Sequence, residues 1–347
     1  MKPGRNIRFQ ALFIIGFFVL IFGCSSGSGD GSKTGGDGGA SETSGDPVLY
    51  IGMMVHLEGY DLAVDPIYNE YKSSILALGD IFTEYGAKLT LEAKEPVAAC
   101  DRRNDHFLKI LEDKGHGIGV HADAGGVPKE GETWETMSRT MKMMKAKLEK
   151  QQVSVRHVSG TCSPLDWVRA VSDAGYSFVS GGVTWCLMSL PEDQIPSQYL
   201  SCSNPAECHD PYPESLRERL HAWTIKKGQP WTENHPDGEL VFIPTAIESL
   251  PYLSEKAENP YFEGKPDFDD EDIDRYMEQL EKALTQLDSE QPNFAYVGWS
   301  YGTRMPEAFA RKWLSAVEPY VETGQVEWKT IPEMYDIYVQ WRDSGIR

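Results

Sequence analysis

The segment GHGIGVHADAGG, residues 115–126, decides how the rest of the sequence is interpreted. Glycine alternates with larger residues up to His121, Asp123 follows two positions later, and two more glycines come after it. A short run of this kind that ends in glycines is typical of a buried strand followed by a loop. Side chains two positions apart on a strand point to the same side. His121 and Asp123 are therefore expected to face one cavity.

Short apolar segments and longer amphipathic segments alternate on both sides of this stretch. The apolar segments predict strands at residues 48–55, 87–93, 116–122, 153–160, 176–183, 239–246, 293–300 and, as an eighth, 325–330. The amphipathic segments predict helices at residues 67–86, 104–115, 134–151, 163–175, 270–288 and 305–321. Ser163 is the expected N-cap of the helix at 163–175, and residues 186–238 are expected to form a long loop.

Alternation of strands and helices predicts a parallel sheet. Residues 47–347 contain no second linker and no internal repeat, so they are expected to form one domain. A (β/α) barrel with seven or eight mostly parallel strands fits this length best. The alternative is an open doubly wound sheet. No G-x-G-x-x-G motif follows the first strand, which disfavours the dinucleotide-binding version of that fold.

The first residues resemble a bacterial lipoprotein signal. Lys2, Arg5 and Arg8 precede the apolar segment ALFIIGFFVLIF at residues 11–22, and Cys24 follows Gly23. The resemblance implies a signal peptide over residues 1–23, with Cys24 as the lipid-modified first residue of the mature chain. The alternative is an uncleaved signal anchor, since Phe22 is bulkier than the residue usual there. In both cases the body is expected outside the cytoplasm, attached to a membrane.

Residues 24–46 contain no large apolar side chain, so they are expected to form a flexible tether behind the lipid anchor. The chain carries a formal net charge of −20. Nucleic acid is therefore an unfavourable partner, because phosphate binding requires a basic surface.

Five cysteines follow Cys24, in an oxidising location. Cys202 and Cys208 lie in the loop SCSNPAECHDP, residues 201–211, and are expected to form a disulfide. Cys162 and Cys186 could form a second pair, which would leave Cys100 as a buried thiol.

Polar side chains gather where the predicted strands end, which is where a barrel of this kind carries its site. They are His56, Glu58, Glu92, His121, Asp123, His157, Ser159, Thr161, Thr245, Glu248, Trp299, Ser300, Tyr301 and Arg304. His56 and Glu58 repeat the spacing of His121 and Asp123. Imidazole and carboxylate together suit zinc or a similar divalent ion. The alternative is a structural hydrogen-bonded pair of His56 and Glu58, with Asp123 capping a turn.

Four stretches resemble the polysaccharide deacetylases. KGHGIGVHADAGG, residues 114–126, resembles the family's G-H-E-I-G run, which leads to a metal-binding histidine, and MMVHLEG, residues 53–59, stands at its T-F-D-D-G motif. VRHVSGTCSP, residues 155–164, and VRAVSDAGYSFVSGGV, residues 168–183, resemble the R-P-P-G region and the A-x-x-x-G-Y continuation. The likeness covers about residues 48–183. It implies a distorted (β/α) barrel that removes acyl groups from amino sugars with a divalent metal.

The resemblance places Glu58 on the family's metal-binding aspartate and His121 on its first metal-binding histidine. Two positions depart from the family. Leu57 stands where the family has its catalytic-base aspartate, and Gly125 stands where it has the second metal-binding histidine. His56 and Asp123 are therefore the expected substitutes as metal ligands; otherwise the fold has lost its metal.

These expectations lead to a metal-dependent hydrolase of acyl groups on a glycan. Asp123 or Glu92 would act as the general base, and Arg304 would stabilise the oxyanion. Three aromatic residues, Trp185, Trp299 and Tyr301, could stack on sugar rings.

Two other functions remain open. The first is a non-catalytic glycan-binding lipoprotein on the same barrel, which the departures at Leu57 and Gly125 favour. The second is a glycoside hydrolase that uses two carboxylates, such as Glu58 and Glu248, and keeps its activity after chelation.

Overall fold

A computed structural model describes residues 46–205, 208, 216, 219–247, 268–300 and 304–345. Several expectations lie outside these residues: the signal peptide, Cys24, all but the last residue of the tether, Glu248 and Tyr301. Residues 44–347 belong to one compact unit.

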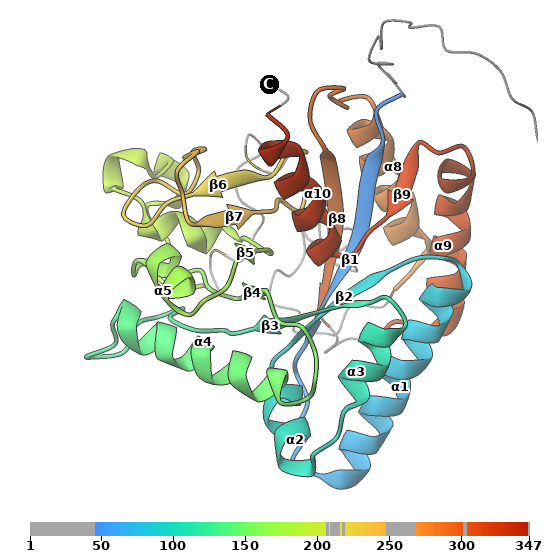
Figure 1. Cartoon of the computed structure of the whole chain (residues 1–347), viewed down its shortest axis with the longest axis horizontal. Helices are drawn as coiled ribbons and strands as arrows, with labels where there is room; N and C mark the ends of the chain where they lie inside the picture. The colour runs from blue at the N-terminus through green and yellow to red at the C-terminus, as the bar shows by residue number, and fades with distance from the viewer. Residues whose placement is uncertain are drawn as a thin grey trace, which may run out of the picture. The chain divides into compact units, whose positions relative to one another are not determined.

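One sheet contains all nine strands found in the described residues (Figure 1). The strands are β1 (Leu49–Leu57), β2 (Leu89–Ala93), β3 (Gly117–His121), β4 (His157–Ser159), β5 (Phe178–Val179), β6 (Trp223–Ile225), β7 (Leu240–Phe242), β8 (Asn293–Ser300) and β9 (Val326–Trp328). Their order is β6-β7-β5-β4-β3-β2-β1-β8, with β9 beside β1. All pairs are parallel except β6 with β7.

Strand β6 corrects the sequence-based expectation, which placed its residues in a loop. It has only three residues and pairs with β7 alone, at the edge of the sheet. A strand this short shows no periodicity that would separate it from a loop.

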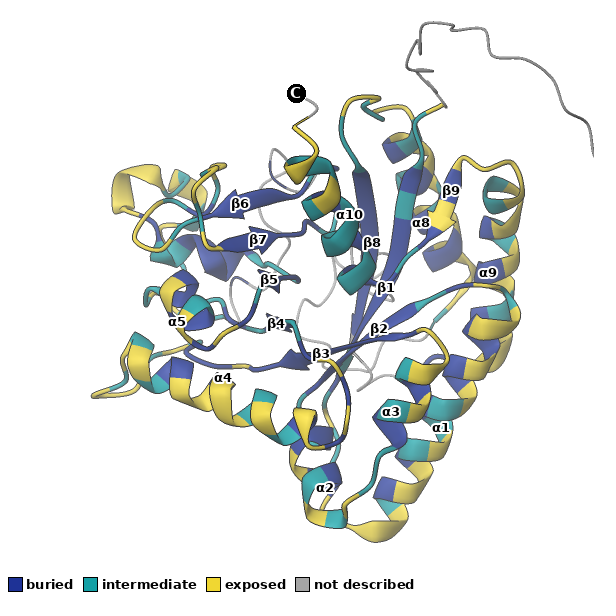
Figure 2. Cartoon of the chain, in the orientation of Figure 1, coloured by how far each residue is buried: buried dark blue, intermediate teal, exposed yellow. Residues whose placement is uncertain are grey.

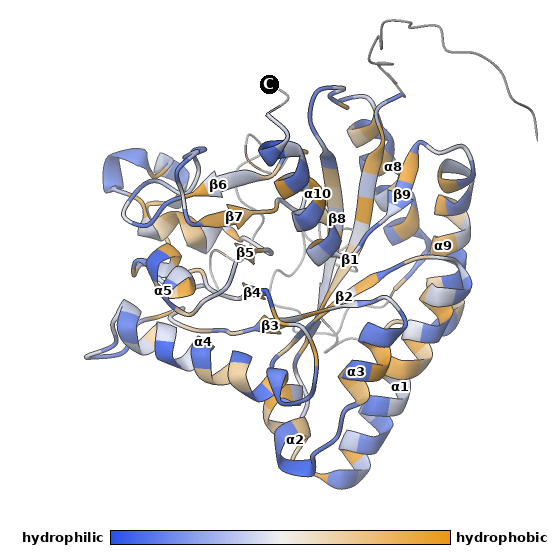
Figure 3. Cartoon of the chain, in the orientation of Figure 1, coloured by the Kyte–Doolittle hydropathy of each residue, from blue (hydrophilic) through white to orange (hydrophobic). Residues whose placement is uncertain are grey.

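The helices lie mainly around the outside of the sheet (Figure 1). They are α1 (Asp65–Glu84), α2 (Glu95–Arg103), α3 (Phe107–Asp113), α4 (Trp134–Glu149), α5 (Trp167–Asp173), α8 (Asp270–Leu284), α9 (Glu307–Glu322) and α10 (Ile331–Asp343), with short 3-10 turns η1 (Thr184–Ser189), η2 (Glu192–Gln194) and η3 (Ser197–Tyr199). Their outward faces are exposed while the strands are mostly buried (Figure 2), and the exposed faces are mostly hydrophilic (Figure 3). None of the helices in the described ranges is both long and apolar enough to cross a bilayer.

The start of α5 also differs from the expectation. The helix begins at Trp167, and the side chain of Asp166 caps it by accepting a hydrogen bond from Arg169 N at 3.0 Å. Ser163 instead accepts from Leu165 N at 3.0 Å and forms a turn ahead of the helix. Both residue types are good N-caps, and local sequence does not decide between them.

The sheet curls into a distorted (β/α) barrel. The residues that follow β7 pair with β8 and so join the two sides of the sheet. Tyr296 N donates to Thr245 O at 2.8 Å, and Ala246 and Tyr296 form a parallel bridge. Tyr296 OH strengthens this junction by donating to Ile243 O at 3.0 Å. The predicted barrel is thereby confirmed against the open doubly wound sheet.

Helix α10 closes the barrel at the end where the strands begin. Lys329 N donates to Ile51 O at 2.7 Å, and Ile331 N donates to Thr90 Oγ1 at 2.8 Å. Side chains of α10 then pack with inward-facing side chains of the strands in one buried cluster, which includes Met54, Phe178, Val241, Ile243, Phe294, Tyr296, Ile331, Met334 and Tyr338. The opposite end, where the strands finish, carries the polar residues.

The neutral imidazole of His116 links β2 to α1. Its Nδ1 accepts from Leu89 N at 3.2 Å, and its Nε2 lies 3.1 Å from Gly79 O. A carbonyl oxygen only accepts, so Nε2 carries the hydrogen. Burial lowers the pKa of His116 below its usual value, against the opposing bond to Gly79.

We predict that His116 makes the fold sensitive to acid. Below the ordinary histidine pKa of about 6.5, the unfolded chain binds a proton that the folded chain excludes, so stability falls as pH falls. His116→Asn keeps an acceptor for Leu89 N and does not titrate. Urea unfolding should show the variant about 1–2 kcal/mol less stable than wild type at pH 7.5, with a smaller gap at pH 5. A gap that stays constant with pH would contradict this role.

Candidate metal centre

Glu58, His121 and Asp123 meet at the mouth of the barrel. His121 Nε2 lies 3.3 Å from Glu58 Oε2 and 3.1 Å from Asp123 Oδ1. One ligand atom from each of the three side chains lies within 4.8 Å of the other two. The side chain of His121 is 7% exposed, whereas that of Asp123 is 45% exposed. The group is thus anchored on the buried side and open to solvent on the other.

The strand ends bring these three side chains together. Glu58 directly follows β1, and His121 is the last residue of β3. Asp123 has a φ of +44°, a left-handed conformation that aspartate tolerates better than most residues. A Cβ at Gly160, the residue after β4, would lie 2.8 Å from both Asp123 N and His121 Cε1. Glycine at 160 therefore allows this loop to pack against the end of β4.

Ser159 fixes the orientation of the His121 ring. Its Oγ lies 2.8 Å from His121 Nδ1 and donates a short hydrogen bond to Glu92. Since its own proton points to Glu92, Ser159 accepts from Nδ1–H of His121. His121 Nε2 then faces the two carboxylates. This is the relay from carboxylate to histidine that holds a metal-binding imidazole in the required tautomer.

Glu92 is the buried centre of this relay. It has no exposed surface, and its two oxygens are shared by four partners. His56 Nε2 lies 3.1 Å from Oε2, which also accepts from Ser159. On the other side, His157 Nε2 lies 3.1 Å from Oε1 and Ser180 Oγ donates to the same oxygen at 2.5 Å. The expectation that Glu92 could be the general base is therefore corrected, because substrate has no access to it.

His56 supports the centre from the side. Its ring stacks on that of His121, with centroids 3.8 Å apart, and its Nε2 is directed at Glu92. His56, Glu92 and His121 also have ligand atoms within 4.8 Å of one another. Because both oxygens of Glu92 already accept hydrogen bonds, the group that contains it is less suited to an ion than the group formed by Glu58, His121 and Asp123.

Lys94 adds a positive charge to the site. Its Nζ lies 2.5 Å from Asp123 Oδ2 and 3.5 Å from Glu58 Oε2. Burial alone would lower the pKa of Lys94, but the contacts with these two carboxylates raise it. Sequence analysis missed Lys94, although it lies two positions after Glu92 at the end of β2, the same spacing that singled out the other strand-end pairs.

The charged groups at the mouth stabilise one another's ionised forms, as their shifted pKa values show. Burial alone would raise the pKa of Glu58, but the hydrogen bond and charge of His121 lower it to about 2. Burial alone would lower the pKa of His121, but Asp123 and Glu58 raise it to about 10. The pKa of Asp123 also lies well below its usual value, because His121 and Lys94 outweigh the effect of burial.

The chemistry of the donor set fits a divalent ion. Two carboxylates and one imidazole of fixed tautomer are the ligands that zinc and similar ions take at catalytic sites.

The structure accounts for the two positions that depart from the deacetylase motifs. Leu57 is fully buried in the core. Gly125 has a φ of +78°, and a Cβ there would lie 2.9 Å from Met137 Sδ, so a histidine at this position would be strained.

Arg304 pairs with residues outside the candidate ligand group. It pairs with Glu70 at 2.7 Å and donates to Tyr60 OH at 3.2 Å, at the side of α1. These contacts occupy the guanidinium, and the expected role of Arg304 in oxyanion stabilisation stays a prediction.

The two described tryptophans expected to stack on sugars are core residues. Trp185 is 4% exposed and donates to Gly126 O at 2.8 Å. Trp299 is 2% exposed and packs edge-on against Phe268. Neither offers an aromatic face to a ligand, which corrects the expectation drawn from their place in the sequence.

The cysteines pair as the loop sequence suggested. Cys202 is bonded to Cys208, Cys162 is bonded to Cys186, and Cys100 is a buried thiol. The first disulfide closes the polar loop, and the second ties the segment after β4 to η1.

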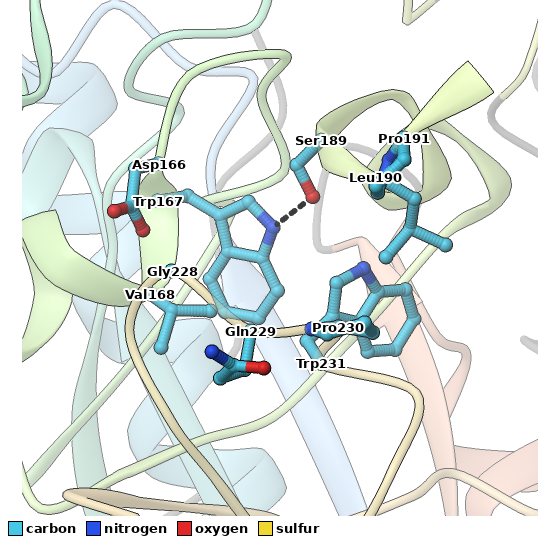
Figure 4. Close-up of a pocket in the computed structure, with 10 residues that line it drawn as sticks. All are labelled: Asp166, Trp167, Val168, Ser189, Leu190, Pro191, Gly228, Gln229, Pro230 and Trp231. Atoms are coloured by element: carbon cyan, nitrogen blue, oxygen red, sulfur yellow. Dashed lines mark hydrogen bonds between the residues drawn. The ribbon is translucent and has the colours of Figure 1, made fainter. Parts of the chain in front are cut away.

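A separate cavity of about 420 Å³ lies beside α5 (Figure 4). It is lined by Asp166, Trp167, Val168, Ser189, Leu190, Pro191, Gly228, Gln229, Pro230 and Trp231. Trp167 Nε1 donates to Ser189 Oγ at 3.1 Å, and both tryptophans are 1% exposed. The cavity contains none of the residues of the candidate metal centre.

We predict that Glu92→Gln destabilises the whole domain. An amide group presents donors where the carboxylate oxygens accept from four partners, which leaves buried groups unpaired. The free energy of unfolding, measured by urea denaturation, should drop by about 3 kcal/mol. The exposed Glu327, which pairs with Lys329, provides a control: Glu327→Gln should change it by less than about 0.5 kcal/mol. Equal effects of the two substitutions would refute the central role of Glu92.

Comparison with known proteins identifies the fold. The sequence matches no protein-family model and no curated protein. A solved structure from Mycobacterium smegmatis, assigned as a polysaccharide deacetylase, superposes with a TM-score of 0.53 and 14% identity over 85% of this chain and 91% of that one. Another from Pseudomonas aeruginosa PAO1, with the same assignment, gives 0.50 and 13% over 86% and 92%. The chain therefore has the fold of the polysaccharide deacetylases.

Proposed function

We propose that this protein is a divalent-metal-dependent hydrolase that removes acyl groups from a glycan outside the cytoplasm. The observation that carries the proposal is the convergence of Glu58, His121 and Asp123 at the mouth of a deacetylase-type barrel. Zinc is the ion that this donor set suits best. The glycan is inferred from the proteins that share the fold.

Each side chain has a defined part in this proposal. His121 Nε2, Glu58 and Asp123 would hold the ion. Ser159, itself fixed by Glu92, accepts from Nδ1–H of His121, so the proton that an ion would displace is the one on Nε2. A divalent ion bound there lowers the pKa of a water molecule and polarises an acyl carbonyl. Lys94 and Asp123 are partly open to solvent, with side chains 34% and 45% exposed.

The lack of a suitable general base favours a second function, a glycan-binding protein without catalysis. Hydrolysis needs a base with a pKa near the working pH. Leu57 stands at the family position of that base, Glu92 is enclosed, and Asp123 is a weak base because its pKa is strongly lowered. A glycoside hydrolase using Glu58 and Glu248 would instead degrade glycan in the presence of chelator.

We predict that His121→Ala abolishes metal binding while sparing the fold. Elemental analysis should find about one divalent ion per wild-type chain and none in the variant. Because a ligand of the native state stabilises it, chelator should lower the melting temperature of wild type and leave that of the variant unchanged. His235→Ala, in the loop between β6 and β7, should behave as wild type.

Activity separates the three functions in the same samples. Acetate release from N-acetylated oligosaccharides, followed by mass spectrometry, should occur with wild type, stop with chelator and be absent from His121→Ala. Metal binding without acetate release would identify the glycan-binding alternative, and glycan cleavage that resists chelator would identify the glycoside hydrolase. A wild-type protein without metal would refute the proposed hydrolase.

We also propose that the protein is a lipoprotein anchored through Cys24, on the strength of the signal-like residues 1–23. Cys24→Ser should abolish incorporation of labelled fatty acid and release or misprocess the protein in cell fractionation. Cys100→Ser is the matched control and should retain the label. An unlabelled wild type at full signal-peptide length would identify an uncleaved anchor instead.

A further inference from the structure

Lys94 is fixed at the mouth of the barrel by its backbone. It directly follows β2 and precedes α2, and its N–H donates to Leu57 O at the end of β1 at 3.2 Å. The side chain therefore starts from a rigid point between two central strands. Its long aliphatic stem lets the ammonium reach several carboxylates from that point.

The ammonium contacts two of the three candidate metal ligands. Nζ lies 2.5 Å from Asp123 Oδ2 and 3.5 Å from Glu58 Oε2. A lysine in this position serves the carboxylates as a counter-ion. A divalent cation bound by the same two carboxylates would lie within a few ångströms of the ammonium, where like charges repel strongly.

A third carboxylate offers the ammonium another partner. Glu95 Oε1 lies 3.9 Å from Lys94 Nζ, and Glu95 Oε2 is buried without a hydrogen-bond partner in the described structure. Glu95 is not in the candidate ligand group. Rotation about the lysine stem could move the ammonium from Asp123 to Glu95 without exposing it fully to water.

We propose that Lys94 is a built-in competitor of the metal: its ammonium occupies Asp123 and Glu58 in the empty site and moves toward Glu95 when an ion binds. This inference rests on the metal site of the proposed function. It makes metal affinity a balance between an internal and an external cation. Lys94 acts on the ion through its ligands and is a positioning residue.

The test is metal affinity in Lys94→Met, which keeps the aliphatic stem and removes the charge. Titration of metal-free protein with zinc, against a fluorescent chelator of known affinity, should show binding at least about tenfold tighter than in wild type, equivalent to about 1.4 kcal/mol. Lys72→Met is the control, because Lys72 pairs with Asp105 on the flank of α1, and its affinity should equal that of wild type.

A thermal measurement checks the same point without relying on affinity. Metal-free Lys94→Met should melt below metal-free wild type, because two carboxylates have lost their counter-ion. Zinc should raise its melting temperature by more than it raises that of wild type. If Lys94→Met does not fold, Lys94→Gln serves in both measurements.

Glu95→Gln tests the second position of the ammonium. In the wild-type background it should weaken zinc binding, because the displaced ammonium loses its alternative partner. In the Lys94→Met background it should have little effect, so the two substitutions are coupled. Equal effects in both backgrounds would overturn the movement toward Glu95.

The outcomes separate this inference from the proposed function. Equal, tight zinc binding by wild type and Lys94→Met would overturn the competition and leave the proposed function standing. Zinc binding by Lys94→Met alone would support the competition and refute the proposed metal enzyme. Failure of both proteins to bind zinc would refute both proposals.

Discussion

The buried carboxylate of Glu92 is the interaction on which the mouth of the barrel depends. A fully buried charge is tolerated only if hydrogen bonds replace its hydration. The replacements come from His56 on β1, His157 and Ser159 on β4, and Ser180 after β5. These strands must therefore keep their relative positions if Glu92 is to keep its hydrogen bonds. The same requirement fixes Ser159 and, through it, the His121 ring.

The groups around His121 would carry a different net charge with and without metal. In the absence of an ion, two positive groups, the imidazolium and the Lys94 ammonium, balance the carboxylates of Glu58 and Asp123. A divalent ion would replace the imidazolium proton and displace the ammonium from these two carboxylates. Because the ammonium would move only as far as Glu95, the mouth would gain one positive charge, next to the Glu95 carboxylate.

Alternating strand and helix patterns sufficed to predict the barrel, and the strand ends were the correct place to look for Glu58, His121 and Asp123. The expected reason differs for Asp123, because β3 ends at His121 and a turn with a φ of +44° at Asp123, instead of the strand, brings the two side chains together. The environment of each side chain was less predictable. Glu92 and Trp299 occupy strand-end positions like those of the site residues, yet both are enclosed by neighbours that arrive from distant parts of the chain. Lys94 shares the two-residue spacing of the other pairs, but a lysine at the start of a helix is most often a solvated surface charge, so its sequence position does not mark it as a site residue. Burial and charge pairing depend on the closed barrel, which a local pattern does not encode.

Helix α10 has a consequence for the order in which the protein is completed. Ile331, Met334 and Tyr338 fill the interior together with Met54 and Phe178, residues that are synthesised much earlier. Until this helix has been synthesised, the inward faces of the strands lack part of their packing. Completion of the interior therefore depends on residues from the C-terminal end of the described chain, and it follows the synthesis of the strands that these residues pack against.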